Sequence, residues 1–315
     1  MKLIKQKLNK LALAAALSVS LGLVASSTYA DRYVYVTHGQ SADPFWSIVK
    51  NGAKTAAKDL GLELDYRSPQ QFDAVRMARL IDAAVATNPD GLIVSVPDAK
   101  ALSASIEKAV KKGIPVITIN AGEEASKKLG ALMHIGQSEY AAAVKAGKYM
   151  KARGVTNGVC VNQEQGNSSL DARCAGFVEG LGGKADVLAT SMDPTEIRNA
   201  ILAYLKQHPD VNGILTLGST AAEPAVDALA AYKKGDHGIK LGTFDLSPRV
   251  LQDVSDGKIE FALDQQQFLQ GYLPLMVMNN YNKFKLLPSD ISTGPNLITK
   301  DKAAAVIKLS KAGYR

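Results

Sequence analysis

The sequence predicts an α/β fold with two lobes, each built on a parallel sheet. Short apolar strands alternate with amphipathic helices along almost the whole chain, and this alternation builds parallel sheets with helices on both faces. So many strands in a chain of 315 residues favour two lobes of similar size over one sheet. A single (β/α)₈ barrel is the competing architecture, because strand counting alone does not exclude it.

The first half of the chain predicts four strands separated by helices. Residues 33–37 form the first strand, and Pro44 opens a helix that runs to Leu60 and stops at Gly61, since proline suits a first helical position. The other elements predicted in this half are strands at 62–66, 91–96 and 114–119, a helix at 71–86, and a helix capped by Asp98 and ended by Gly113.

The same alternation restarts in the second half. The predicted strands lie at 159–161, 187–190, 213–217, 239–244 and 259–263. The predicted helices lie near 168–181, 194–206, 221–233 and 247–256. Residues 290–315 then read as a loop, a short strand at 296–299 and a terminal helix. This repetition of one pattern is the basis for predicting two lobes of the same kind.

Residues 1–30 have the composition of an export signal. Lys2 and three further lysines precede an apolar stretch at 11–24, and Thr28 and Ala30 place small residues where a signal peptidase reads. We expect a mature chain that begins near Asp31 and resides in the periplasm. An uncleaved membrane anchor is the alternative, and the absence of a cysteine at the cleavage point disfavours a lipid anchor.

Removing this leader lowers the formal net charge from +7 to +3, that is, from 37 basic against 30 acidic residues to 33 against 30. The high isoelectric point is therefore largely a property of the leader, and it gives no reason to expect nucleic-acid binding. Beyond the leader, no apolar run is long enough to predict a membrane span.

Polar residues cluster just beyond the ends of the predicted strands, where ligands bind in open α/β sheets. Each of them could instead cap a helix or form a turn. The run 264–267 indicates a polar pocket wall, because four consecutive residues there can accept hydrogen bonds. The polar residues beyond the other strand ends are His38, Gln40, Asp43, Asn120, Asn162, Gln163, Glu164, Ser219, Thr220 and Asp245.

The loop that follows the first strand carries Phe45 and Trp46, the only tryptophan in the chain. Aromatic rings stack on the C–H faces of sugars while nearby carboxylates bind the hydroxyls, so this loop predicts a sugar-type site. The two aromatics could instead belong to the core. On the helix near 168–181, Arg173 could donate to hydroxyls, or it could form a surface ion pair with Asp171.

Cys160 and Cys174 are the only two cysteines, and export permits a disulfide between them. Two buried thiols are the alternative reading. Motifs for catalysis are absent: the four histidines lack metal-ligand spacing, and no G-x-S-x-G, GxxxxGK[ST] or GxGxxG motif occurs where it would be needed. We therefore predict no catalytic residues, no metal and no cofactor, and a protein that is not an enzyme.

Taken in order, several segments resemble the periplasmic sugar-binding proteins of ABC transporters, specifically the ribose-binding class. The segments are 43–46, 113–120, 134–137, 175–177, 241–245 and 256–258 leading to Gln265. The resemblance implies a type I periplasmic binding protein, with two Rossmann-like lobes joined by three crossings near residues 137–138, 265–266 and 292–293. It implies an N-terminal lobe of residues 31–137 plus 266–293 and a C-terminal lobe of residues 138–265 plus 294–315.

The resemblance also implies site residues. Asp43, Phe45 and Trp46 match the part of the family's pocket that is formed by an asparagine and aromatic residues. Gln265 matches the family's hinge glutamine. Asn120 and Asp245 match its two pocket aspartates. The chain departs from the pattern at Ala121 and Asp171, where the family carries arginine, and at residues 218–220, where the family carries an asparagine. A ribose pocket is therefore not expected, and another pentose, a hexose, a polyol or a furanosyl signal molecule fits these departures.

The function implied is capture of a monosaccharide or polyol between the lobes and delivery to an ABC permease. A periplasmic receptor that signals to a chemoreceptor or a sensor kinase is the alternative. The export signal stands where a transcriptional regulator would carry a helix-turn-helix, so a regulator is not expected.

Overall fold

The computed structural model describes residues 30–40, 43–232 and 238–315. The predicted export signal, except for Ala30, lies outside these ranges, as do loop residues 41–42 and His237. Among the helices that are described, none combines the length and the apolar character that crossing a membrane requires.

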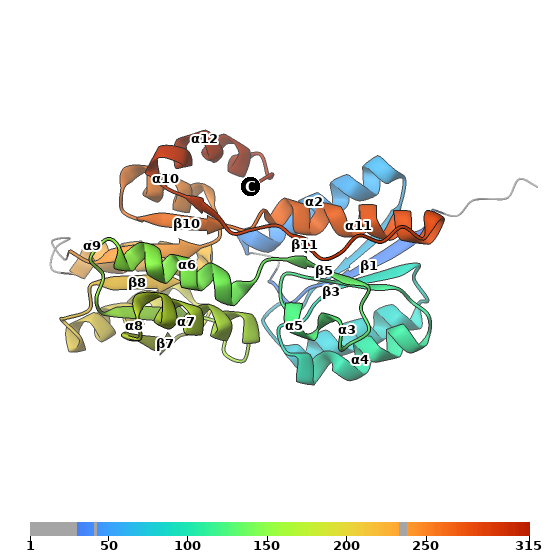
Figure 1. The fold of residues 1–315 in the computed structure, drawn as a ribbon, viewed down its shortest axis with the longest axis horizontal. Helices are drawn as coiled ribbons and strands as arrows, with labels where there is room; N and C mark the ends of the chain where they lie inside the picture. The colour runs from blue at the N-terminus through green and yellow to red at the C-terminus, as the bar shows by residue number, and fades with distance from the viewer. Residues whose placement is uncertain (1–29, 41–42, 233–237) are drawn as a thin grey trace, which may run out of the picture. The chain divides into compact units, whose positions relative to one another are not determined.

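The strands of the described chain form two six-stranded sheets, which excludes the single barrel (Figure 1). The first sheet has the order β11-β5-β4-β3-β1-β2, and all its neighbouring strands are parallel. Its strands are β1 (Arg32–Val36), β2 (Glu63–Arg67), β3 (Gly91–Ser95), β4 (Val116–Ile119), β5 (Met133–Gly136) and β11 (Ile291–Ser292). We call the elements around this sheet the N-terminal lobe.

The second sheet has the order β12-β10-β9-β8-β6-β7, so both sheets repeat one winding. Its strands are β6 (Gly158–Asn162), β7 (Ala185–Ala189), β8 (Gly213–Thr216), β9 (Lys240–Phe244), β10 (Phe261–Asp264) and β12 (Asn296–Ile298). Only β12 runs antiparallel to its neighbour among the described strands. The elements around this sheet form the C-terminal lobe, and the predicted α/β class with two parallel sheets is confirmed.

Helices cover both sheets. The N-terminal lobe contains α2 (Pro44–Leu60), α3 (Ala74–Ala86), α4 (Ala99–Lys111), α5 (Glu123–Ser126) and α11 (Gln267–Phe284). The C-terminal lobe contains α6 (Glu139–Lys151), α7 (Ser168–Leu181), α8 (Pro194–Gln207), α9 (Ser219–Ala231), α10 (Pro248–Asp256) and α12 (Lys300–Lys311). The sequence did not lead us to predict β5, β11, α5, α6 or α11.

Local signals account for the helix starts that were predicted. Asp43 accepts a hydrogen bond from the Phe45 N–H at 2.9 Å, and Asp98 accepts one from the Ala101 N–H at 3.0 Å. These side chains satisfy backbone donors that the first turn of a helix leaves unpaired. Asp43 therefore serves as a helix cap, in the loop that joins β1 to α2.

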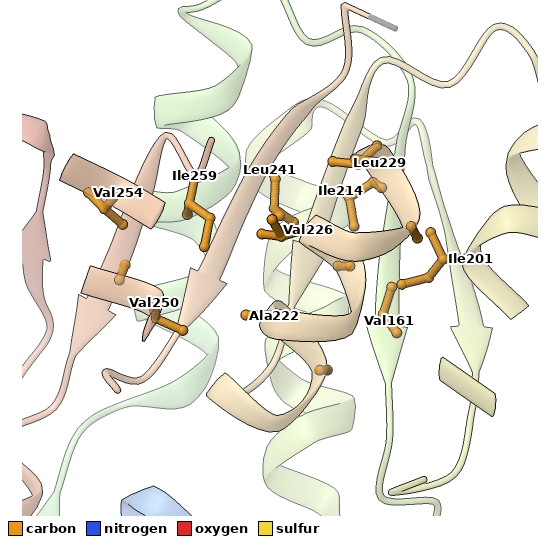
Figure 2. Packing of buried hydrophobic residues seen from close by; sticks show 14 of the residues in the cluster. Val161, Ile201, Ile214, Ala222, Val226, Leu229, Leu241, Val250, Val254 and Ile259 are labelled. Carbon is orange, nitrogen blue, oxygen red and sulfur yellow. The ribbon is translucent and has the colours of Figure 1, made fainter. Parts of the chain in front are cut away.

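The core of the C-terminal lobe shows how the helices are held against the sheet (Figure 2). Ala222, Val226 and Leu229 of α9 pack over the sheet, next to Ile214 of β8 and Leu241 of β9. All five side chains are buried. This packing fixes the amino end of α9, which begins at Ser219, beside the carboxyl ends of the strands.

A disulfide joins Cys160 of β6 to Cys174 of α7. The two cysteines are 14 residues apart, and closing a loop of that size stabilises a protein by about 3 kcal/mol in the chain-entropy model. The bond anchors α7 to the sheet, and α7 carries Arg173.

Helices α2 and α11 cross at close range through glycines (Figure 1). A Cβ added at Gly271 would lie 1.9 Å from the Val49 carbonyl oxygen, and one added at Gly52 would lie 2.1 Å from the Phe268 carbonyl oxygen. Both obstacles are backbone atoms, which cannot swing aside as a side chain can.

Gly271→Ala is therefore expected to destabilise the protein by about 1–3 kcal/mol, the usual cost of overpacking, although alanine favours a helix more than glycine does. Urea unfolding measures the change. Lys283→Ala, at an exposed position of the same helix, is the matched control. A Gly271→Ala variant as stable as the control would contradict the close crossing.

Candidate functional site

The loops at the carboxyl ends of strands from both lobes surround a small inner cavity of about 30 Å³. The inner cavity is lined by His38, Asp43, Phe45, Trp46, Asn120, Gln163, Glu164, Leu170, Arg173, Leu217, Gly218, Thr220, Asp245 and Gln265. In sheets with this winding, ligands bind at the point where the strand order reverses, and the loop after β1 lies at that point.

Three rings from the N-terminal lobe, those of His38, Phe45 and Trp46, line the cavity together with Asp43 and Asn120. Ser95 Oγ fixes His38, at 3.0 Å from the His38 N–H and 2.8 Å from its Nδ1. The Trp46 ring meets the His38 ring edge to face at 4.7 Å between centroids, and Phe45 packs on Trp46 at 5.0 Å. Burial, followed by the charge of Arg173, lowers the pKa of His38 to about 3, so this imidazole is neutral at physiological pH.

Gln265 connects the two lobes across the cavity. Its Oε1 accepts from Asn120 Nδ2 at 3.3 Å, and its Nε2 donates to Asp245 Oδ1 at 2.6 Å. Asn120 follows β4 and Asp245 follows β9, two strands at equivalent places in the repeated winding. Both residues have a left-handed backbone, with φ of 59° and 66°, a conformation that Asn and Asp tolerate better than most residues.

Arg173 is a cation buried in the cavity wall, only 3% exposed. Its Nε and Nη2 donate to the two oxygens of Glu139 at 2.6 and 2.9 Å, and its Nη1 donates to the Leu217 carbonyl at 2.6 Å. Burial alone would lower the pKa of Arg173, but Glu139 and then Asp245 outweigh that effect and raise it. The guanidinium is therefore charged, and Glu139 fixes its position.

Three carboxyl groups face the cavity. Burial raises the pKa of Asp43 to about 7, and the charges of Asp245 and Glu164 add to the rise. Burial also raises the pKa of Asp245 to about 7, against the opposing effects of Arg173 and Gln265. Glu164 comes from the C-terminal lobe and lies 3.9 Å from His38 of the N-terminal lobe. The Asn167 amide nitrogen lies between them, at 2.7 Å from Glu164 Oε2 and 3.4 Å from His38 Nε2. The cavity lining therefore has three acidic side chains and one side chain that is cationic at physiological pH, Arg173.

The raised pKa of Asp43 predicts a pH-dependent stability difference between the ligand-free protein and its Asp43→Asn variant, which keeps a capping side chain. A carboxyl whose folded-state pKa is raised contributes stability below its unfolded-state pKa, near 4, and loses it as the pH rises to about 7. The wild type should therefore lose thermal stability relative to Asp43→Asn between pH 5 and pH 8.

The lowered pKa of His38 makes its contribution to stability rise with pH, opposite to that of Asp43. Both proteins contain His38, so its contribution cancels when they are compared at the same pH. Asp73→Asn replaces an exposed helix cap and reports the effect of this substitution on capping alone. If the difference in melting temperature between wild type and Asp43→Asn stays constant from pH 5 to pH 8, burial of a charged Asp43 is refuted.

The structure brings nine of the thirteen predicted site residues to the inner cavity. Gln40 and Ser219 line a neighbouring, larger cavity instead. Asn162 and Asp171 are not brought to the inner cavity, because they bond to each other at 3.0 Å. Asn162 Oδ1 also accepts from the Glu164 N–H at 3.0 Å, so Asn162 shapes the loop that carries Glu164.

The predicted pocket wall at residues 264–267 is wrong except for Gln265. Asp264 is fully buried and pairs with Arg315 at 2.6 Å, and Gln266 donates to the Thr293 carbonyl at 2.7 Å. Asp264 ends β10 and Gln267 begins α11, and of the four residues only Gln265 lines the cavity.

Sequence reasoning missed Glu139 and Asn167, which hold Arg173, His38 and Glu164 in place, and it missed the apolar lining from Leu170 and Leu217. Glu139 was hidden because α6 was not predicted. Among the described residues, no group of His, Cys, Asp or Glu is arranged to hold a metal ion.

The lobes touch each other beside the cavity. Ser168, at the start of α7, donates through both its N–H and its hydroxyl to the Pro97 carbonyl of the N-terminal lobe, at 2.9 and 2.8 Å. Two lobes that meet over a polar cavity with aromatic rings on one wall define a class of protein, the two-lobed solute-binding proteins.

The comparison with protein families agrees with this class. The model of the periplasmic binding protein domain family matches residues 33–286, and the chain belongs to that family. A carbohydrate transporter from Acidothermus cellulolyticus, solved in complex with myo-inositol, is 34% identical with a TM-score of 0.86, covering 91% of this chain and 100% of that one.

Curated relatives are more distant. The xylose/arabinose-binding protein XylF of Sulfolobus acidocaldarius is 26% identical over 303 residues, which are 89% of this chain and 74% of that protein. The ribose import binding protein RbsB of Haemophilus influenzae is 26% identical over 290 residues, covering 90% of this chain and 97% of that protein.

Proposed function

We propose that this chain is the sugar-binding protein of an ABC transporter, and that it holds a neutral, polyhydroxylated ring of the cyclitol or monosaccharide class between its lobes. The observation that carries the proposal is the set of polar side chains from both lobes at the inner cavity: Asp43 and Asn120 from one lobe, Asp245 from the other, and Gln265, which bonds to Asn120 and Asp245. Carboxylates in such a site accept strong, charge-assisted hydrogen bonds from hydroxyl groups.

The charge balance argues for a neutral ligand. Arg173 is a guanidinium in the cavity wall, and Glu139 already neutralises it through two hydrogen bonds. Asp43, Glu164 and Asp245 remain to face the ligand. An anionic ligand would place its charge among these carboxylates in a desolvated site, which is costly, whereas a neutral polyol supplies the hydroxyl donors they need.

The aromatic wall and the relatives support a ring. Phe45 and Trp46 provide apolar faces, and their neighbour His38 is a neutral imidazole with hydrogen-bonding nitrogens. The relative solved with myo-inositol is more similar to this chain, at 34% identity, than the pentose-binding relatives described above, at 26%. Asn120-Ala121, which departs from the ribose-class pattern, also favours a ligand other than ribose.

We propose that the lobes open before a ring enters. The inner cavity of about 30 Å³ has room for roughly two or three water molecules, too little for a six-membered ring. Hinge motion at residues 137–138, 265–266 and 292–293 would separate the walls. In support, β5 ends at Gly136 in the first sheet, and α6 begins at Glu139 in the C-terminal lobe.

We propose further that the protein works in the periplasm after export directed by residues 1–30, and that its partner is a membrane permease. The basic and apolar composition of that segment supports export. The relatives described above are import, transport and sugar-binding proteins, which favours a permease over a chemoreceptor as the partner.

Isothermal titration calorimetry on residues 31–315, stripped of ligand by unfolding and refolding, tests the proposed ligand class. We expect myo-inositol or a neutral sugar of the panel xylose, ribose, glucose and galactose to bind with a Kd in the micromolar range or below. Glucuronate, which differs from glucose by one carboxylate, is the matched control and should not bind. Binding of glucuronate alone, or of no neutral compound, would overturn the proposal.

A further inference from the structure

A second, larger cavity lies directly beside the inner one. This outer cavity has a volume of about 560 Å³, within the range of small-molecule sites. Asp43 and Thr220 line both cavities, so the outer cavity continues from the inner one. The loop before α2 contributes from the N-terminal lobe, and the starts of α8 and α9 contribute from the C-terminal lobe.

One buried hydroxyl in the outer cavity has no partner. Ser219 is 2% exposed, its Oγ makes no hydrogen bond, and it stands at the start of α9, which no side chain caps. A buried hydroxyl without a partner is costly. Ser219 Oγ is covered from solvent, so the side chain would have to turn toward the cavity to bond to a polar ligand group, and that bond would remove the cost. The hydroxyl of a bound sugar can donate to Ser219 Oγ or accept from it.

The rest of the lining suits a neutral ring. Pro44, Met192, Pro194 and Pro224 supply apolar surface of the kind on which the C–H face of a sugar packs. The charges largely compensate one another, because Arg249 bonds to Asp227 and lies 3.7 Å from Asp253. Glu223 accepts from the Ser247 hydroxyl at 2.8 Å. With Arg198 and Asp43 included, the lining carries two cationic side chains against three acidic ones, so it shows no large excess of charge that would select an ion.

We propose that the outer cavity is a second sugar subsite, so that the protein binds two-ring ligands, with the first ring among Asp43, Trp46 and Asp245 and the second beside Ser219 and Thr220. The ligand class is a glycosylated cyclitol or a disaccharide. This inference rests on the proposed function, because it assumes that the inner cavity takes a ring. The glycosidic link would lie beside Asp43 and Thr220, which line both cavities.

Matched pairs of one-ring and two-ring compounds test the subsite: myo-inositol against galactinol, and xylose against xylobiose, titrated by calorimetry into residues 31–315. We expect one two-ring compound to bind at least as tightly as its one-ring partner. Thr195→Trp fills the outer cavity from an exposed position at the start of α8. It should weaken the two-ring compound at least tenfold more than the one-ring compound.

Lys206→Trp, exposed at the far end of α8, is the matched control and should leave both affinities as in the wild type. Met192→Trp provides a second filling variant if Thr195→Trp folds poorly by circular dichroism. Binding of one-ring compounds without any two-ring compound overturns the second subsite and leaves the proposed function standing. Two-ring binding that neither filling variant weakens selectively also overturns it. Failure of all these compounds and of every neutral sugar in the panel given above overturns both.

Discussion

Replacing Glu139 with alanine is expected to lower the free energy of unfolding by about 3–5 kcal/mol, the usual cost of removing one partner of a buried ion pair. Glu139 is 7% exposed and binds Arg173 through both carboxylate oxygens. Without it, a guanidinium would remain buried with the Leu217 carbonyl as its nearest acceptor and Asp245 at 3.9 Å. The loss exceeds the energy of a surface pair because Arg173 is only 3% exposed, so its guanidinium would lose its charged partner in a poorly solvated site.

Urea unfolding of residues 31–315 measures this loss, with Glu124→Ala, an exposed glutamate in the N-terminal lobe, as the matched control. The double variant Glu139→Leu with Arg173→Met removes both charges and should recover much of the stability, because apolar side chains of similar size can replace a buried ion pair. A loss below about 1 kcal/mol for Glu139→Ala, the range of an exposed pair, would contradict the buried pair.

Asp245→Asn is expected to weaken ligand binding by about 2–3 kcal/mol, which is roughly 30- to 150-fold in Kd, because charge-assisted hydrogen bonds to ligand hydroxyls become neutral ones. The substitution keeps the shape of the side chain and suits the backbone, since asparagine tolerates the φ of 66° at this position. The carbonyl oxygen of the new side-chain amide could still accept from the Gln265 amide.

The matched control is Asp210→Asn, in the loop between α8 and β8 at an exposed position. Calorimetry with the compound that binds the wild type measures both Kd values. Folding should not suffer in Asp245→Asn, because burial raises the pKa of this carboxyl and so opposes its charge. A Kd within threefold of the wild type would show that Asp245 does not contact the ligand.

Local chemistry explains why much of the fold was predictable. Pro44, Asp98 and Gly61 act on their own neighbours, so the sequence alone places the start of α2, the start of α4 and the end of α2. Helix α11 was not predicted because it contains Gly271 and Pro274, and glycine and proline usually interrupt helices. Close contact with α2 compensates at Gly271, and this contact joins segments more than two hundred residues apart.

The site was predictable where a residue follows a strand and not where it depends on a distant partner. Asp43, Asn120 and Asp245 were found because each follows a parallel strand. Arg173 and Asp171 lie two positions apart on α7, and a helix turns them to different faces.

Arg173 lies three residues after Leu170 and four before Phe177, both buried, and this spacing was a usable signal for its inward direction. Its partner Glu139 lies 34 residues away on a helix that was not predicted. No local pattern indicates that pair.

The fluorescence of Trp46, the only tryptophan, tests the central claim most directly. Its ring lines the inner cavity, so a ligand held between the lobes must change its surroundings. Titration of ligand-stripped residues 31–315 with myo-inositol and the neutral sugars should give a saturable change for at least one compound, and Asp245→Asn, on the opposite lobe, should shift that curve to higher concentration. A folded protein whose Trp46 emission responds to none of them would contradict a site between the lobes.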